Sequence, residues 1–444
     1  MHLTKCLLAI LLICRFPQSG AQTNWAMKDP LNPAFILTTQ IDGDSVTGFT
    51  RKGALVDYVG EAKLNLYKMA AGLKYAEIVH FTGQFKPGSS TSFEGTWNYL
   101  FTENSFRAVV SKDSLIITLL DKESQTVRIV RGAKAGPDMG YNYTPVIKNI
   151  LSLTEKYLYD TVFLASKDWQ NFRERLTANA PLIPDDMEMQ VGFFAIAREF
   201  PFSHYSQQVT DAGREKPAAN FILSEPAPGT CLLRVRAFEG SRQAIDTVIG
   251  RIAAGGYTTL IIDLRDNGGG THETALPLIA FLSPRPVYGG FFPNRKWYEQ
   301  FKRPPSDSDY HYFNEFRAGS LDDFYRDAER GYGLYVNVIP SAKHFSGRVY
   351  VLTNQRTAST AEIFALGLKE NKLAILAGKK TAGAALSGKK FSVDQRFSVM
   401  IPVSDYVSPL GYRIDKRGIV PDIKINSGDE LEYLLKQVAA GTGN

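Results

Sequence analysis

Cysteine is scarce in this chain of 444 residues, which contains only three. Two of them, Cys6 and Cys14, lie in an N-terminal segment that we expect to be removed, so Cys231 is predicted to be the only cysteine of the mature protein. This excludes an internal disulfide bond. Cys231 opens the apolar run CLLRV and is interpreted as a small buried hydrophobic residue. No cysteine or histidine cluster has zinc spacing, so we expect no metal and no cofactor.

Long apolar runs and strong net charge are also missing. Beyond the N-terminal segment no uninterrupted apolar run approaches the roughly 18 residues of a membrane-spanning helix. The formal charge of +6 falls to +4 without Lys5 and Arg15, and no stripe of basic and aromatic residues follows the chain. We therefore expect neither a membrane span nor a nucleic-acid partner. The length favours two or three globular domains.

The first 21 residues have the organisation of a secretory signal. Lys5 supplies a positive charge, Cys6–Cys14 is a short apolar core, and Ser19-Gly20-Ala21 provides small residues for cleavage. A lipoprotein signal at Cys14 is the weaker interpretation, because the bulky Ile13 precedes it. We predict an exported protein, either periplasmic or secreted.

Residues 22–140 read as a β-rich domain. From residue 35 to residue 129 the segments are rich in β-branched and aromatic residues and are separated by turn-forming stretches. The last three, FRAVV, SLIITLL and TVRIV, are predicted to form a meander. The domain has no chemical motif, and both a docking module and a simple folded extension remain open.

Helical patterns follow at residues 146–165, 168–176 and 185–200, and the last of them ends at Pro201-Phe202-Ser203-His204-Tyr205. A histidine just past a helix end is most often a surface or capping group. A catalytic role for His204 is the alternative.

A strand at 229–238, a helix at 241–253 and a strand at 257–264 form a βαβ unit, which predicts a mostly parallel sheet. The second strand runs into Asp263-Leu264-Arg265-Asp266-Asn267-Gly268-Gly269-Gly270. A phosphate-binding loop would end in Gly-Lys-Ser/Thr, which is absent. Three glycines that let backbone N–H groups converge fit an oxyanion hole better, although a simple glycine turn remains open.

The stretch VLTNQRTASTAEIF, from Val351 to Phe364, places Ser359 where a strand gives way to a helix. Ser359 or Thr357 could be only a helix N-cap, with Glu362 completing a capping box. The alternative is a nucleophile at the end of the sheet, beside the free N–H groups of a helix N-terminus. Between the glycine loop and the stretch that contains Ser359, residues 283–343 form a polar, aromatic insertion. We interpret it as a long surface loop on the substrate side.

Four motifs in order, IIDLRDNGGG, TASTAEIFA, AGKKTAGA and RGIVPDIKI, resemble the tail-specific, or C-terminal processing, serine proteases. The resemblance covers roughly residues 229–427. It implies an α/β core of the ClpP/crotonase type with Ser359 as the nucleophile. It also implies two kinds of oxyanion donor, the N–H of Thr360 and that of Gly269 or Gly270.

The chain departs from the Ser-Lys branch of that family. Ala384 stands where that branch has its catalytic lysine, and the interval between His204 and Gly229 is too short for a PDZ domain. In the tricorn-core-like branch a Ser-His pair supplies the base, and an acidic residue near the C-terminal motif orients it. Ser203-His204 and Asp415 occupy the corresponding places. Other candidates for the base are His272 and, through a shifted loop, Lys389 or Lys390.

The sequence thus predicts an exported serine endopeptidase that acts on unfolded or C-terminal peptide segments, with a peptide or protein substrate as its partner and possible homo-oligomers. The alternative is a catalytically inactive relative that binds peptides or ligands in the same cleft. The expected organisation is a signal peptide at 1–21, a β-rich domain at 22–140, a helical subdomain with Ser203-His204 at 141–228, a protease core at 229–430 and a C-terminal helix at 431–444.

Overall fold

The computed structural model describes residues 22–136, 140–209, 219–426 and 428–440. The predicted signal segment at 1–21 therefore lies outside the described residues. The chain divides into two compact units. The first contains the residues up to Asn142 together with Leu182–Gly192, and the second contains Tyr143–Pro181 together with the chain from Phe193 onward.

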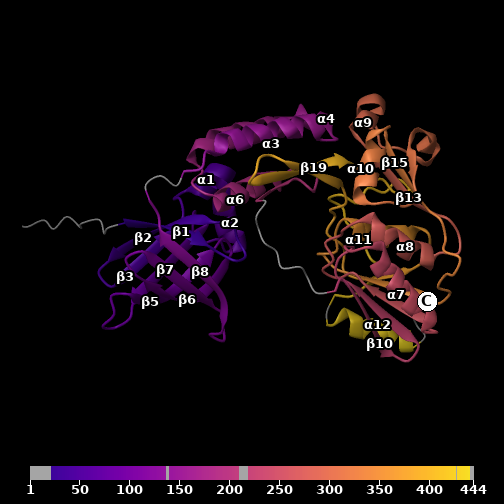
Figure 1. The fold of residues 1–444 in the computed structure, drawn as a ribbon, viewed down its shortest axis with the longest axis horizontal. Helices are drawn as coiled ribbons and strands as arrows, with labels where there is room; N and C mark the ends of the chain where they lie inside the picture. Colours follow the sequence, from indigo (N-terminus) through magenta and orange to yellow (C-terminus); the bar gives the residue numbers. More distant parts are fainter. Residues whose placement is uncertain (1–21, 137–139, 210–218, 427, 441–444) are drawn as a thin grey trace, which may run out of the picture. The chain divides into compact units, whose positions relative to one another are not determined.

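The first unit is built on a closed barrel of eight strands (Figure 1), in which each strand pairs antiparallel with the next and β1 pairs with β8. Large aromatic side chains such as Phe81, Trp97 and Phe106 fill its core. The predicted meander is present as β6, β7 and β8. The strands are β1 Gln22–Lys28, β2 Phe35–Asp42, β3 Ser45–Phe49, β4 Val79–Phe85, β5 Ser92–Tyr99, β6 Thr102–Val110, β7 Ser114–Leu120 and β8 Thr126–Lys134.

The prediction of β structure from residue 35 to residue 129 is wrong for the interval between β3 and β4. Two helices lie there, α1 (Ala54–Val59) and α2 (Glu61–Ala71). The sequence of α2, EAKLNLYKMAA, is rich in alanine, leucine and lysine, which favour helix. Gly53 precedes α1, Gly60 separates the two helices and Gly72 follows α2, with φ angles of 72°, 79° and 73° that glycine adopts without strain.

The helical subdomain predicted at 141–228 is divided between the two units, because Leu182–Gly192 packs with the barrel. The Asp185 carboxylate accepts the backbone N–H of Ile36 at 2.9 Å. The carboxylate of Glu188, which is 1% exposed, pairs with Arg51 at 2.6 Å. These contacts satisfy buried acidic groups that the helical pattern alone does not reveal.

The second unit is centred on a six-stranded sheet in the order β10-β11-β12-β16-β17-β20. The β10–β11 pair is antiparallel, and every other pair is parallel. The predicted βαβ unit is present, with helix α7 (Arg242–Ala254) between β11 and β12. The strands are β10 Phe221–Ala227, β11 Thr230–Val235, β12 Thr259–Asp263, β16 Arg348–Thr353, β17 Ile375–Gly378 and β20 Ile423–Lys424.

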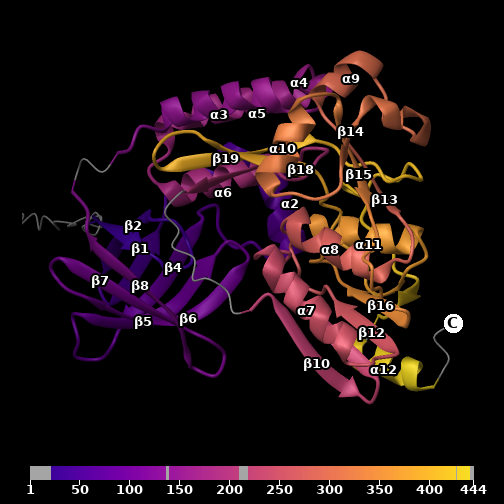
Figure 2. The same ribbon diagram turned by 45° about the vertical axis from the view of Figure 1, so that its right-hand side comes forward.

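Helices cover both faces of this sheet (Figure 2). Alternate residues of the strands, such as Leu260 and Ile262, pack in one cluster with α7, α8 (His272–Leu282) and α11 (Thr360–Glu370). Ile261 and its neighbours face the other way and pack with α12 (Glu430–Ala439). The near-continuous apolar strands are explained by burial on both faces.

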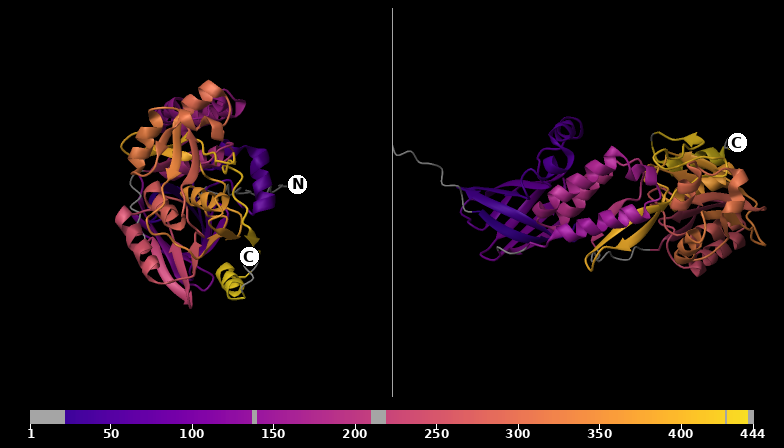
Figure 3. Two further views of the ribbon diagram at one scale, coloured as in Figure 1. Left: turned by 90° about the vertical axis from the view of Figure 1, so that its right-hand side faces the viewer. Right: turned by 90° about the horizontal axis from the view of Figure 1, so that it is seen from above.

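Three helices precede the six-stranded sheet in the chain: α3 (Tyr143–Tyr157), α4 (Thr161–Leu164) and α5 (Lys167–Asn179). The single helix predicted at 146–165 is therefore two helices, α3 and α4, and Asp160 caps the second of them. Helix α3 lies along a separate three-stranded sheet of β9, β18 and β19 (Figures 2 and 3). These strands are Ser206–Val209, Ser387–Ser392 and Phe397–Ser404.

The insertion at 283–343 is a folded element. Strands β13 (Val287–Pro293), β14 (Asn314–Phe316) and β15 (Gly333–Val338) form a sheet, and helices α9 (Arg295–Phe301), η2 (Asp307–Tyr312) and α10 (Leu321–Glu329) connect them. Its aromatic residues are largely internal, since Phe291 and Trp297 are fully buried. The composition that suggested a surface loop instead builds a second aromatic core.

Across the described part of the chain, no helix combines the length and apolarity needed to cross a bilayer. The same residues contain no group of three or more histidine, cysteine or acidic side chains that could hold a metal ion. α6, the remaining helix, spans Asp186–Ala197 and leads to Ser203-His204.

Candidate active site

Ser359 has an unusual backbone conformation at the junction between β16 and α11. Its φ and ψ are 57° and −129°, a region that non-glycine residues rarely occupy. Although Ser359 precedes the first residue of α11, its side chain makes no capping hydrogen bond. The prediction that Ser359 caps the helix with its hydroxyl is therefore wrong. The backbone turns the hydroxyl away from the helix that follows.

The capping box is incomplete, because the Ser359 side chain does not cap the helix, although the Glu362 carboxylate does take a backbone hydrogen bond from Ser359. Glu362 is fully buried, and its carboxylate accepts the hydroxyl of Thr381 at 2.5 Å and the backbone N–H groups of Gly383 and Ala384 at 2.9 and 2.8 Å. Burial raises the pKa of this carboxyl, and the hydrogen bonds from Thr381, Ala384, Gly383 and Ser359 oppose that effect. Thr357, the other proposed cap, donates its hydroxyl to the Leu264 carbonyl at 2.8 Å. The tertiary structure uses these polar groups to hold loops together.

The loop that contains Ala384 fixes the backbone of Ser359. The N–H of Ser359 donates to the carbonyl of Ala384 at 2.6 Å, and the N–H of Ala358 donates to the carbonyl of Asn267 at 2.9 Å. Ala384, the position where the Ser-Lys branch has its lysine, thus contacts the serine through its main chain. Glu362 holds that same residue from the other side.

Ser359 stands at one end of a chain of four polar side chains. Its Oγ lies 3.1 Å from His204 Nε2. His204 Nδ1 lies 2.8 Å from Ser203 Oγ, which in turn lies 2.5 Å from Asp415 Oδ1. The structure therefore brings together Ser359, His204, Ser203 and Asp415, which the sequence analysis singled out.

The donor and acceptor roles along this chain follow from the carboxylate. Ionised Asp415 only accepts hydrogen bonds, so Ser203 spends its single hydroxyl proton on Asp415. Ser203 Oγ must then accept the proton of His204 Nδ1–H. The neutral imidazole consequently has its lone pair on Nε2, where it faces the hydroxyl of Ser359. This is the tautomer that can remove a proton from a serine.

Burial lowers the pKa of His204, and the negative charge of Asp415 partly restores it. The imidazole is therefore neutral over a wider pH range than a histidine in water. His204 also has a positive φ of 59°. Gly388 in β18 leaves room for it, because a side-chain carbon at that position would come within 3.1 Å of His204 Cβ.

Asp415 is anchored by more than the serine hydroxyl. Its second oxygen accepts the N–H of Ser203 at 2.9 Å, and Oδ1 also accepts the N–H of Ala385 at 3.1 Å. The neighbouring N–H of Lys416 donates to the Gly383 carbonyl at 2.7 Å. The loops around residues 203, 384 and 415 are thus tied to one another, which fixes the acid that orients Ser203.

The glycine loop after β12 lies directly against Ser359. A side-chain carbon on Gly269, whose φ is +109°, would come within 2.6 Å of Ser359 Cβ. The N–H of Gly269 is already used, because it donates to Asn267 Oδ1 at 2.8 Å. Gly270 accepts the Thr360 hydroxyl on its carbonyl at 2.8 Å. Within the described residues, no acceptor is found for the N–H of Gly270 or for that of Thr360.

The other candidates for the base are placed differently. His272 is buried against Phe324 and Phe292, with ring centroids 4.7 and 5.4 Å away, and burial lowers its pKa to about 4. Lys389 pairs with Glu329 at 2.5 Å. Over the ranges that the structure covers, no hydrogen bond or ion pair links His272, Lys389 or Lys390 to Ser359.

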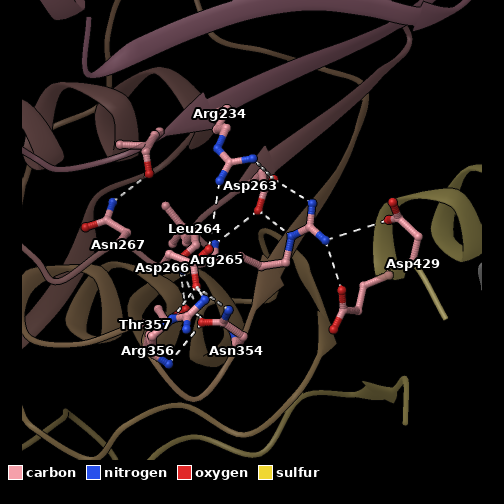
Figure 4. A network of polar contacts seen from close by, with 12 residues as sticks. Arg234, Asp263, Leu264, Arg265, Asp266, Asn267, Asn354, Arg356, Thr357 and Asp429 are labelled. Atoms are coloured by element: carbon pink, nitrogen blue, oxygen red, sulfur yellow. Dashed lines mark hydrogen bonds and ion pairs between the residues drawn. The ribbon is translucent and has the colours of Figure 1, made fainter. Parts of the chain in front are cut away.

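A polar network joins the two loops that carry Gly269 and Ser359 (Figure 4). Asp266 accepts hydrogen bonds from Asn354 at 2.8 Å and from Arg356 at 2.7 Å. Beside it, the buried Asp263 accepts two bonds from Arg265, each of 2.9 Å. Asn267, which the sequence analysis did not single out, donates to the Val235 carbonyl and accepts from Gly269. An asparagine just before three glycines was the available signal for this role.

Residues 229–425 match the model of peptidase family S41. A carboxyl-terminal-processing protease of Picosynechococcus sp. is 42% identical over 72 residues, which are 16% of this chain and 17% of that protein. Carboxyl-terminal-processing peptidase 2 of Arabidopsis thaliana, a chloroplastic protein, is 26% identical over 181 residues, which are 41% of this chain and 28% of that protein. The match therefore spans 17% of the length of the first relative and 28% of the length of the second.

Among solved structures, a lipoprotein from Streptococcus agalactiae has a TM-score of 0.48 and 16% sequence identity, over 68% of this chain and 97% of the other. The sequence relatives are named as processing proteases and peptidases. The part of the chain that contains Gly269, Ser359 and Asp415 is therefore similar to peptidase family S41.

Proposed function

We propose that the protein is a serine endopeptidase in which Ser359 is the nucleophile and His204 is the general base. The observation that carries this proposal is the uninterrupted path from Ser359 Oγ through His204 and Ser203 to Asp415, with steps of 3.1, 2.8 and 2.5 Å. A free serine hydroxyl is barely ionised near neutral pH and needs an adjacent base. Here the neutral Nε2 of His204 faces it.

The reaction begins when Ser359 Oγ attacks the peptide carbonyl while its proton moves to His204 Nε2. The C–N bond then breaks, and the imidazolium returns the proton to the leaving amine. In the second half, His204 takes a proton from a water molecule whose oxygen attacks the acyl-enzyme ester, and Ser359 leaves with that proton. Ser203 and Asp415 hold the ring in orientation throughout, and the carboxylate favours the transient imidazolium.

The negative oxygen of the tetrahedral intermediate would be bound by the N–H groups of Thr360 and Gly270. Both lack an acceptor among the described residues, and Gly270 is tied to Thr360 through the 2.8 Å bond from the Thr360 hydroxyl. The N–H of Gly269, the other candidate, is held by Asn267. We therefore favour Gly270 as the second donor, with Gly269 providing the space in which Ser359 moves. Loss of one such donor typically raises the barrier by about 2.7–4 kcal/mol.

Two finer features remain proposals. We infer that the substrate is an unfolded or C-terminal segment of a protein, by analogy with the processing role in the names of the relatives. We also infer that the protein is exported after cleavage behind Ala21. Mass measurement of the protein recovered from an expressing cell tests export, since a mature chain is expected to begin at Gln22, whereas a retained Met1 would contradict it.

Labelling with a fluorophosphonate probe tests the nucleophile and the base. The parent is expected to react, and Ser359→Ala and His204→Ala are expected to lose labelling. Ser224→Ala is the matched control, because Ser224 is an exposed serine on β10. Equal labelling of the parent and Ser359→Ala would exclude Ser359 as the nucleophile. Labelling that survives His204→Ala but is lost in Lys389→Ala would move the base.

The alternative function is peptide binding without catalysis. It is supported by Ala384 in place of a lysine, but the complete path from Ser359 to Asp415 speaks against it. Digestion of an unfolded protein such as reduced casein separates the two. A parent protein that neither reacts with the probe nor cleaves casein, while still binding it, would favour the inactive relative.

A further inference from the structure

A cavity of about 540 Å³ lies beside the glycine loop, in the second unit. Its walls come from the outer face of α8, Arg242 at the start of α7, residues 317–320 before α10, and residues 338–341 at the end of β15 and just after it. These elements lie side by side in the fold (Figure 2). Neither Ser359 nor His204 is part of the wall. The apolar lining residues are Leu276, Pro277, Ala280, Val338, Ile339 and Pro340.

His272 is the unusual member of this wall. It is 9% exposed, it lines the cavity, and no hydrogen-bond partner for its ring is found among the described residues. Neither ring nitrogen is among the fully buried polar atoms that lack a partner, so the ring is open to the space of the cavity, where a ligand can meet it. Its low pKa, about 4, keeps the ring neutral, so that it offers one donor and one acceptor.

The two arginines of the wall already have counter-ions. The Arg242 guanidinium pairs with Asp246 at 2.9 Å, and Arg317 pairs with Glu315 at 2.9 Å. Glu273 accepts the backbone N–H of Arg242 at 3.3 Å. An anionic ligand group would have to compete with these carboxylates for the two arginines, and most of the remaining wall is apolar. The cavity therefore fits an uncharged, mainly apolar group.

The cavity is also close to the proposed oxyanion site along the chain. His272 follows Gly270 by two residues, a separation of at most about 7 Å. A bound peptide advances about 3.3 Å per residue, so the His272 end of the cavity lies within about three substrate residues of the carbonyl held by Gly270.

From this placement we propose that the cavity is a specificity subsite, which takes a large apolar side chain of the peptide substrate within about three residues of the scissile bond, with His272 as its one polar contact. This inference rests on the proposed peptidase function. It deepens that function by naming the side-chain class that the enzyme selects. Aspartate and glutamate side chains are disfavoured at this subsite, because the two arginines of its wall are already paired.

The test uses two cavity variants of the full-length protein. Ala280→Trp fills the space, and Ile339→Glu places a carboxylate at the wall. Ile339 is 48% exposed, so this second variant is expected to fold even if the first does not. Ala253→Trp is the matched control, because Ala253 is an exposed residue of α7 outside the cavity.

All proteins digest the same library of unfolded proteome-derived peptides, and cleavage sites are mapped by mass spectrometry. The readout is the ratio of large apolar residues to alanine at each position, which does not depend on the fraction of active enzyme. The parent and Ala253→Trp are expected to select leucine, phenylalanine or methionine at one position. Ala280→Trp is expected to lower that ratio about tenfold. Ile339→Glu is expected to raise the ratio of lysine to leucine there.

Two results would overturn the subsite. One is a parent enzyme with no apolar preference within three residues of the cleaved bond. The other is an unchanged cleavage profile in both cavity variants. If the parent neither reacts with the fluorophosphonate nor cleaves peptides, the proposed function fails by itself. Titration of fluorescein-labelled reduced casein then tests whether the cavity binds a peptide side chain. Ala280→Trp must weaken casein binding about tenfold relative to Ala253→Trp, and equal binding by the two variants excludes the subsite.

Discussion

Two histidines of the second unit, the buried His272 and the partly buried His204, differ in their surroundings. Burial lowers the pKa of both, to about 4 for His272 and below the usual value for His204. His204 has a partner on each ring nitrogen and a carboxylate one residue further along the path. His272 is surrounded by phenylalanine rings and a cavity. Burial alone therefore does not identify a base, because a base also needs an oriented ring and a proton donor within reach.

The largest expected effect is the difference between His204→Gln and His272→Gln. His204→Gln is expected to lower the kcat for peptide hydrolysis about a thousandfold or more, because no group remains to accept the Ser359 proton. His272→Gln is expected to lose at most about tenfold, as kcat/KM, because it meets substrate away from the reacting atoms. Steady-state hydrolysis of a quenched peptide measures both. A greater loss in His272→Gln would reverse the assignment.

The glycine loop offers the next largest effect. Gly269→Ala is expected to lower kcat about 100-fold or more, because the added methyl carbon would lie 2.6 Å from Ser359 Cβ and the φ of +109° is strained for alanine. Gly268→Ala is the control, since nothing lies within 4 Å of the position of its side-chain carbon. Comparable rates for the two variants would show that Ser359 is not packed against Gly269 during catalysis.

Asp415 is expected to govern the pH dependence of the base. Hydrolysis requires neutral His204, so the rate rises with pH as the ring loses its proton. Burial lowers the pKa of this ring from its usual value of 6.5. The Asp415 charge raises this pKa, so Asp415→Asn is expected to move the acid limb of kcat/KM to lower pH, and to lower the plateau about tenfold or more because the ring loses its orienting acid. His272→Gln should leave the limb in place. An upward shift in Asp415→Asn would contradict the proposed path.

The smallest effect concerns stability. In the unfolded chain His272 has an ordinary pKa of about 6.5, and in the folded protein its pKa is about 4. The unfolded state thus binds more protons between these values, and the free energy of unfolding falls as pH falls from 6.5 towards 4. Each pKa unit is worth about 1.4 kcal/mol, so the loss approaches roughly 3 kcal/mol. Chemical denaturation of the parent and of His272→Phe measures it, and an equal loss in both would refute this origin.

The sequence alone determined the elements with strong local signals. The apolar runs around β12 and β16 and the amphipathic pattern of α7 predict the parallel sheet, because strands buried on both faces carry apolar residues at nearly every position. Ser203-His204, Ser359 and Asp415 were singled out from motifs. The helices α1 and α2 were missed, although the composition of α2 favours helix, because the surrounding β pattern dominated the interpretation.

Only the tertiary structure decided what the polar groups do. Ser203 and Asp415 are 212 positions apart, and no local pattern fixes the 2.5 Å bond that makes Ser203 an acceptor for the His204 ring. Glu362 has the spacing of a helix cap, yet burial directs its carboxylate to the loop of Gly383 and Ala384, since a buried carboxylate takes the donors that the fold places around it. Motifs therefore name the residues of the site, while long-range packing assigns each its partner and its protonation state.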